Sequence, residues 1–139
     1  MGVQQIVSKV QSYIGAISGM RSAPASPPDQ PKMFPFSLVY PGEGEWSMEP
    51  ISWKKGLHSI VIEIHVQRRD LPRDFESVVG FCESIPNALF RELVADKWDG
   101  TVDTIGTISY VFGVLGYGGM DTIGFKFTVN GVKAQSALT

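Results

Sequence analysis

The most constraining feature of this sequence is an alternating stretch, Leu57 to Gln67, that is followed at once by a helical pattern. In LHSIVIEIHVQ, apolar residues at positions 60, 62, 64 and 66 alternate with mostly polar ones, with Val61 as the exception. Period-two alternation rich in β-branched residues is typical of a half-buried strand. After the turn RRDLPRD, apolar side chains recur at helical spacing in FESVVGFCESI. A long strand followed by an amphipathic helix predicts an α+β scaffold.

Another helix is expected near the N-terminus, over residues 3 to 18. Apolar side chains recur there along one stripe, and Gly19 stands where a C-terminal capping glycine belongs. The stretch from 21 to 35 has prolines at positions 24, 27, 28, 31 and 35. Because proline lacks a backbone N–H and restricts the residue before it, this stretch is expected to be an extended tether. So short a helix cannot bury itself alone, so the tether is not a domain boundary.

Alternating patterns predict the rest of the sheet. FSLVY at 36–40 is expected to form a strand that ends at the turn Pro41-Gly42. A short strand is expected at 44–49, followed by an exposed connection as far as Gly56. A further helical turn or two at 87–93 and a polar loop at 95–100 would follow the central helix. Two late strands are expected over 107–114 and 123–130, and the glycine-rich connector GVLGYGGMD would join them as a hairpin.

These elements predict one α+β domain with the order α-β-β-β-α-β-β. A mainly antiparallel sheet of about four to five strands would carry two helices packed on one face. The body of the domain would span residues 36 to 133. A chain of 139 residues that is 43% hydrophobic is large enough to bury a real core.

Charge and composition argue against several classes of partner. A net charge of −2 and a pI near 5.6 leave no basic footprint for nucleic acid or for an anionic membrane. No apolar run approaches the ~18 residues of a membrane span, and no basic segment followed by an apolar block predicts a secretory signal. The single cysteine, Cys82, excludes an internal disulfide, fits a reducing cytoplasm and is expected to be an inert core residue.

The polar residues give little sign of catalysis. His58 and His65 are seven positions apart on one strand, so they face opposite sides and are expected to be partly exposed rather than metal ligands. The glycine-rich connector lacks the pattern of a phosphate-binding loop and leads to a strand rather than a helix N-terminus. Glu43, Glu45 and Glu49 are expected in a solvated loop. Without a GxSxG motif or a Ser/His/Asp set at recognisable spacing, no enzyme activity, cofactor or metal site is expected.

Aromatic and arginine side chains outside the expected core point instead to assembly. Trp, Tyr and Arg are the residue types enriched at the hot spots of protein interfaces. The candidate interface residues are Trp46, Trp53, Arg68, Arg69, Asp70, Arg73 and Tyr117. Trp98 falls in the expected polar loop and joins the aromatic set by the same reasoning. Two other interpretations stay open, because the aromatic residues could pack their loops onto the core and the charged turn could be ordinary solvated surface.

As a whole, the chain resembles small phage tail proteins of the tail-terminator, or tail-completion, type. The resemblance spans roughly residues 3 to 133 and rests on element order together with the segments FPFSLVYPGEGEW, GLHSIVIEIHVQRRDLPRD, SIPNALF and GYGGMDTIGFKFTV. It implies a protein that forms a ring, commonly hexameric, at the head-proximal end of a long tail. Such a ring ends polymerisation of the tail tube and presents a surface for joining the capsid.

A ring of this kind needs two different, complementary patches on each subunit, because its contacts run head to tail. The charged turn at 68–73 and the acidic stretch at 43–49 could supply opposite charges for such contacts. The expected partners are copies of the chain itself, the tail tube protein and a head–neck connector protein, in a virion assembled in the host cytoplasm. The alternatives are a head–neck connector or another small tail subunit, and a cytoplasmic ligand-binding or small enzymatic α+β domain.

Overall fold

The structure is a computed structural model that describes residues 2–20, 34–49, 53–67, 71–117, 119 and 121–137. Its elements are α1 (Val3–Gly15), β1 (Phe36–Glu49), β2 (Trp53–Gln67), α2 (Leu71–Gly100), β3 (Ile108–Val114) and β4 (Thr122–Ala137). The prediction of an α+β fold with an antiparallel sheet of about four strands and two helices is confirmed. The expected tether at 21–35 lies outside the described residues, except for its last two positions.

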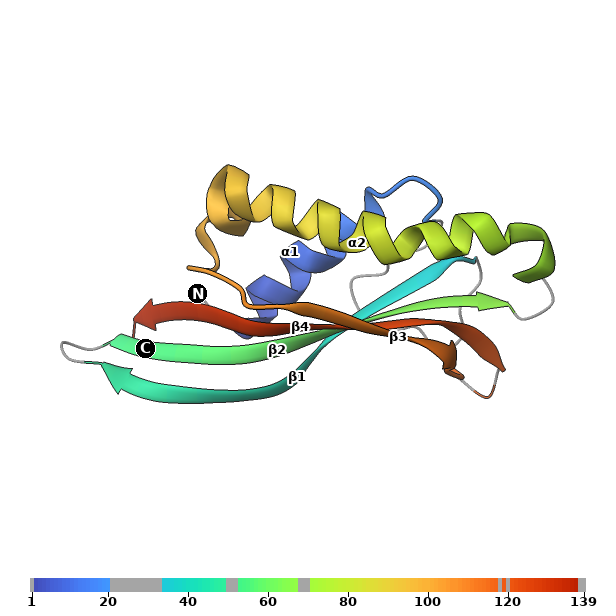
Figure 1. The fold of residues 1–139 in the computed structure, drawn as a ribbon. Helices are drawn as coiled ribbons and strands as arrows, with labels where there is room; N and C mark the ends of the chain where they lie inside the picture. The colour runs from blue at the N-terminus through green and yellow to red at the C-terminus, as the bar shows by residue number, and fades with distance from the viewer. Residues whose placement is uncertain are drawn as a thin grey trace.

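The four strands form one antiparallel sheet in the order β1-β2-β4-β3. Strands β1 and β3 are therefore the two edges of the sheet. The pairing of β2 with β4 places Ile62 opposite Phe127 and Ile64 opposite Phe125, so these four side chains share one face. Both helices lie on that face (Figure 1), and we call the other side of the sheet the open face.

The first strand is longer than the sequence predicts. The expected strands at 36–40 and 44–49 form the single strand β1, so the element order is α-β-β-α-β-β. The predicted chain reversal at Pro41-Gly42 is wrong, because the pairing with β2 continues and only shifts its register between Pro41 and Gly44, as a β-bulge does. Strand β2 already begins at Trp53, so 53–56 is not an exposed connection. Residues 44–49 of β1, 53–58 of β2 and 132–137 of β4 form a three-stranded arm that extends beyond the helices (Figure 1).

The central helix α2 runs from Leu71 to Gly100 and contains Pro86. A proline inside a helix removes one backbone hydrogen bond and favours a break. The helix continues through it because Ile85 and Leu89, on either side, are both fully buried in the core. The predicted polar loop at 95–100 is also wrong, because α2 continues to Gly100. Trp98 in this stretch is fully buried, and its Nε1–H donates to the Leu89 carbonyl oxygen at 2.8 Å.

Burial of Trp98 is accompanied by a left-handed backbone at the end of α2. Lys97, Trp98 and Asp99 have φ values of 55°, 53° and 57°. This conformation costs a non-glycine residue about 1–2 kcal/mol, whereas fully burying a large apolar side chain stabilises by about 1.5–3 kcal/mol. Burial of the Trp98 indole thus offsets much of the backbone strain of the left-handed turn that directs it into the core. Trp98 is a core residue, and its interpretation as an exposed interface residue is wrong.

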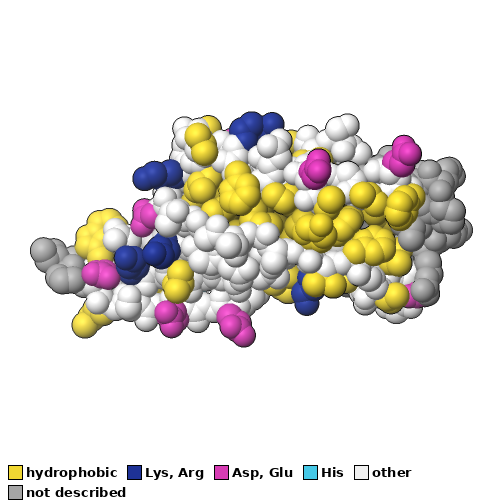
Figure 2. Space-filling model, in the orientation of Figure 1, with side chains coloured by type: hydrophobic (Ala, Val, Ile, Leu, Met, Phe, Trp, Pro, Cys, Tyr) yellow, Lys and Arg dark blue, Asp and Glu magenta, His cyan; other side chains and the backbone are white. Residues whose placement is uncertain are grey.

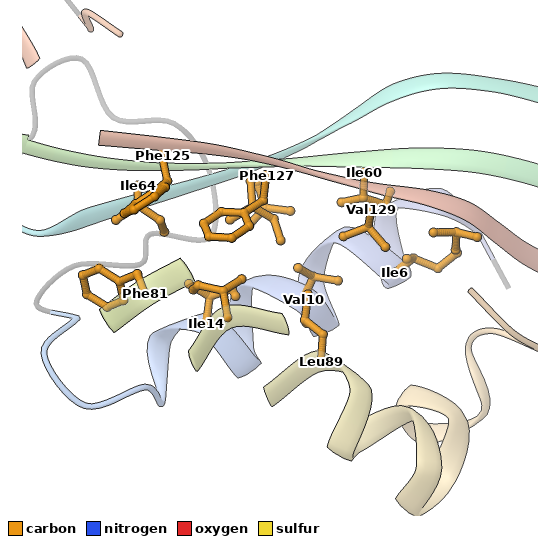
Figure 3. Packing of buried hydrophobic residues seen from close by; sticks show 14 of the residues in the cluster. Ile6, Val10, Ile14, Ile60, Ile64, Phe81, Leu89, Phe125, Phe127 and Val129 are labelled. Carbon is orange, nitrogen blue, oxygen red and sulfur yellow. The ribbon is translucent and has the colours of Figure 1, made fainter. Parts of the chain in front are cut away.

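The core lies between the sheet and the two helices (Figure 3). Ile6, Val10 and Ile14 of α1 point toward the sheet, and Phe81 and Leu89 of α2 join the same cluster. Each of these five side chains is at most 2% exposed. Helix α1 packs against β1 and α2, while α2 also packs against β2. The predicted core residue Cys82 is half-buried and packs against this cluster. None of the described helices combines the length and apolar character needed to cross a membrane.

Candidate functional site

The open face of the sheet holds a buried polar network. Glu63 and His65 lie on β2, Tyr40 lies on β1, and Thr122 begins β4. His65 Nδ1 is 2.7 Å from Thr122 Oγ1, and His65 Nε2 is 2.8 Å from Glu63 Oε1. The Tyr40 hydroxyl donates to the other carboxylate oxygen of Glu63. His65 and Thr122 are fully buried, while Tyr40 and Glu63 are half-buried, so the network connects three strands from the interior to the surface.

The donors and acceptors of this network fit one arrangement. Because an ionised carboxylate only accepts, His65 Nε2–H donates to Glu63 Oε1. In a neutral imidazole Nδ1 is then the acceptor, so the Thr122 hydroxyl donates to it, while Thr122 Oγ1 accepts the backbone N–H of Gly116 at 2.9 Å. We assign this tautomer from the partners of the two ring nitrogens. Each link from Gly116 to Glu63 then has one donor and one acceptor.

Two aromatic rings close over His65. The ring centroids of Phe36 and Tyr117 lie 5.4 Å and 5.8 Å from that of His65, and 5.3 Å from each other. Phe36 is itself fully buried, and Tyr117 belongs to the connector between β3 and β4. The prediction that His65 is a partly exposed sheet residue is wrong, because rings from distant parts of the sequence cover it.

The environment of the network shifts two pKa values. The hydrogen bond from His65 lowers the pKa of Glu63; burial opposes this change, and the hydrogen bond from Tyr40 adds to it. Burial raises the pKa of Tyr40, and its hydrogen bond to Glu63 raises that pKa further. Both shifts favour a state in which Glu63 is charged and Tyr40 keeps its proton.

The order Thr122, His65, Glu63 has the connectivity of a nucleophile, a general base and an orienting carboxylate. Sequence spacing does not reveal this set, because Thr122 is 57 positions from His65 and on another strand. A nucleophile also needs open space about 3 Å from its oxygen for the reacting atom. Thr122 is 0% exposed and its oxygen already accepts the Gly116 N–H. The geometry therefore supports a structural role, in which the hydrogen bonds of Thr122, His65, Glu63 and Tyr40 hold the connector and three strands in register. We call this set of hydrogen bonds the latch.

His58 occupies a second buried position, at the base of the arm. It is 6% exposed, and Gly44 and Gly56 flank its ring so closely that a Cβ at either position would overlap a ring nitrogen. The centroids of the Trp46 and His58 rings lie 4.6 Å apart, and the two rings are arranged edge to face. Burial lowers the pKa of His58, and its Nε2 has no hydrogen-bond partner within the described chain. The prediction of a partly exposed His58 is therefore also wrong, since the two glycines let its ring sink between the strands.

The described residues contain no group of three or more His, Cys, Asp or Glu side chains that could hold a metal ion. The acidic residues at 43, 45 and 49 lie on strand β1 rather than in a loop; the first two are exposed and the third is half-buried.

The structure separates the candidate interface residues. Trp46 lies on strand β1 of the arm and Trp53 on strand β2, and they are 43% and 46% exposed. Tyr117 lies far from them in the fold, half-buried against Phe36 and His65. Arg68, Arg69 and Asp70 fall outside the described residues. Arg73 is described only as a position in α2. Of the candidate interface residues, Trp46 and Trp53 on the arm are thus the ones whose aromatic side chains are exposed to solvent.

A second exposed apolar surface is missed by the sequence reasoning, and we call it the β3 surface. Its members are 39–58% exposed and come from α2 and β3: Phe75, Val79, Tyr110, Phe112 and Val114. Figure 2 shows hydrophobic side chains gathered in a band between α2 and the β3 side of the sheet. The rings of Tyr110 and Phe112 lie 5.6 Å and 5.0 Å from that of buried Phe125, so the core continues to the surface here.

The alternation in ISYVFGV contains a signal for this surface. Tyr110 and Phe112 have the spacing of core residues, and they point to the same face as Phe125 and Phe127. They remain exposed because β3 is an edge strand that the helices do not cover (Figure 1). The exposure of Tyr110 and Phe112 follows from the order of the strands, which the sequence pattern of one strand does not show.

Neither a protein-family profile nor a curated protein matches this chain. The likeness to tail-terminator proteins therefore rests on the quoted segments and on an expected order α-β-β-β-α-β-β, whose first two strands are one strand in the structure.

Proposed function

We propose that this protein is a structural subunit of a phage virion. Copies of the chain close into a ring, most simply of six subunits, on the head-proximal end of the tail tube. The ring ends polymerisation of the tube protein and gives the head–neck connector a surface to join. No chemical step is part of this role.

The observation that carries the proposal is the presence of two unlike apolar surfaces at opposite ends of the sheet. The arm exposes Trp46 and Met48 on one face at one end, and the β3 surface lies toward the other (Figures 1 and 2). Large exposed apolar patches on a small protein mark interaction sites. Two patches of different shape, far apart on one subunit, suit the head-to-tail contacts from which rings are built.

The interior supports the same role. The polar network and the rings of Phe36 and Tyr117 tie the β3–β4 connector to β1 and β2, and both strands continue into the arm. A ring subunit needs a fixed geometry, because the angle between its two contact surfaces sets the number of subunits at closure.

The function is tested by adding the protein to the polymerising tail tube protein of the same phage. The expected result is tubes of limited length that carry a ring at one end in electron micrographs. Addition after polymerisation should place rings on tube ends without shortening the tubes. Tubes of unchanged length with no protein at either end would contradict the proposal.

A further inference from the structure

Of the two edges of the sheet, only β1 is protected against pairing with another chain. Edge strands are normally blunted by proline, charge or a bulge. Strand β1 has Pro41, a bulge beside it and three glutamates. Strand β3 reads ISYVFGV, with no charged residue and no proline. An unprotected apolar edge next to exposed Phe75 and Val79 indicates a surface that becomes covered on assembly.

One face of the arm has the properties to cover it. Cross-strand partners point to the same side of a sheet, so the pairings Trp46 with Gly56 and Met48 with Lys54 place these residues on one face. Met48 is 84% exposed, and Lys54 Nζ lies 4.4 Å from the Trp46 ring centroid. Residues of opposite parity at 45, 49 and 53 lie on the other face. This arm face therefore combines two large apolar side chains with one positive charge and no carboxylate.

The charges beside the β3 surface are of the opposite sign. Glu76 and Glu83 are exposed on α2 and are seven residues apart, which places them on one side of the helix, next to Phe75 and Val79. Figure 2 shows acidic side chains along the α2 edge of the hydrophobic band. The acidic α2 edge of this apolar surface is complementary to an arm face that carries Lys54.

The arm cannot reach the β3 surface of its own subunit, because the two lie toward opposite ends of the sheet (Figure 1). We infer that, in the proposed ring, the arm face of one subunit packs on the β3 surface of the next copy, with Lys54 beside Glu76 and Glu83. This inference rests on the proposed function, because it specifies the contact that closes the ring.

The contact between copies is head to tail rather than two-fold. A two-fold pairing of β3 surfaces would bring the acidic rims of both copies to one interface and would leave both arms exposed. The arm-to-surface contact buries both apolar areas and pairs opposite charges. It repeats from copy to copy until the ring closes.

Two variants and their mixture test the inference. The arm variant Trp46→Ser/Met48→Glu and the surface variant Phe75→Lys/Val114→Lys each change one half of the contact at exposed positions. Light scattering should show that each variant alone is a monomer under conditions in which the wild type assembles. A 1:1 mixture should give a heterodimer and nothing larger, because one intact arm meets one intact β3 surface. Val94→Lys, at an 88% exposed position of α2 outside the β3 surface, is the matched control and should assemble like the wild type.

The outcomes separate this inference from the proposed function. If the wild type forms rings and both variants form them equally well, the contact lies elsewhere and only the inference fails. If the arm variant alone forms a dimer, the contact is two-fold and the inference fails too. If the wild type is a monomer even on the tail tube, the proposed ring fails first.

Charge reversal provides a second test that does not remove apolar side chains. Lys54→Glu should weaken assembly at least tenfold, measured as the protein concentration at half-assembly. The triple variant Lys54→Glu/Glu76→Lys/Glu83→Lys should recover most of that loss, because the pair is restored with its signs exchanged. Equal assembly of the wild type and the Lys54→Glu variant, or no recovery in the triple variant, would overturn the placement of Lys54.

Discussion

His65 Nδ1 lies 2.7 Å from Thr122 Oγ1, although the two residues are 57 positions apart in the sequence. Their contact joins the central strand β2 to the first residue of β4. Because Gly116 donates to the same hydroxyl, it also fixes the connector that leads from β3. The contact thus ties the β3–β4 connector to the central strand β2.

Loss of the Thr122 hydroxyl should destabilise the fold without abolishing it. Thr122→Val keeps the shape of the side chain but leaves His65 Nδ1 and the Gly116 N–H without their partner. An unsatisfied buried polar group costs about 1–3 kcal/mol, so the free energy of unfolding in urea should fall by about that amount. Thr128→Val is the control, because Thr128 is half-buried on the same strand and its hydroxyl makes no hydrogen bond within the described chain. An equal loss in both variants would contradict the latch.

Gly124 should tolerate no side chain. A Cβ at Gly124 would overlap the carbonyl oxygen of Ile64 on the neighbouring strand, and that backbone atom cannot move without breaking the pairing of β2 with β4. Gly124→Ala should therefore destabilise by more than about 3 kcal/mol, or prevent folding. Gly113 lies directly opposite on β3, and a Cβ there would meet nothing within 4 Å. Gly113→Ala should stay within about 1 kcal/mol of the wild type in the same thermal melt. A tolerated Gly124→Ala would show that the register is wrong.

Trp98 should be the tryptophan on which stability depends most. Trp98→Ala removes a fully buried indole and its hydrogen bond to Leu89, and large-to-small substitutions of this kind cost about 3–5 kcal/mol. Val94→Ala, four positions earlier and 88% exposed, should change the unfolding free energy by less than about 0.5 kcal/mol. Chemical denaturation followed by circular dichroism measures both. Similar, small losses for the two variants would place residues 95–100 in a loop after all.

Acidification should weaken the fold through His58. Its pKa is lowered by burial from an ordinary value of 6.5. Above that pH the ring is neutral in both states, so its contribution to stability is fully present. Below it, the unfolded chain binds a proton that the folded chain resists, and stability falls by at most about 1.4 kcal/mol per pH unit until the folded pKa is passed.

The comparison of pH 7.5 with pH 5.5 isolates this effect in urea unfolding. His58→Phe should show a smaller loss between the two pH values, whatever its absolute stability. Glu63 does not confuse the result: its pKa is lowered from 4.5, so its contribution is lost only as the pH falls below that value. An unchanged pH dependence in the variant would mean that His58 is not desolvated.

Local patterns predict most of the elements but not their surroundings. The alternation in 57–67 predicts the helix-facing side of β2, and the stripe at 3–18 predicts α1, because both signals lie within one element. The dipeptide Pro41-Gly42 favours a turn in isolation, but pairing with β2 along the whole strand makes a bulge instead. Trp98 has polar neighbours in the sequence, but its side chain is fully buried in the core cluster that both helices and the sheet form.

The candidate sites depend even more on topology. Tyr40, Glu63, His65 and Thr122 meet only because the strand order is β1-β2-β4-β3. The same order leaves β3 at an edge and exposes Tyr110 and Phe112. Of the predicted interface residues, Trp46 and Trp53 are exposed as expected, although they stand on strands rather than on loops. Their role in assembly remains a prediction.

The most direct test of the account is the mass of the wild-type particle in solution and on the tail tube, measured by light scattering and electron microscopy across a range of salt concentrations. The expected result is one closed species of more than two copies, most simply six, in solution or at the tube end. A monomer or a two-fold dimer under every condition, with the tube protein present, would contradict it.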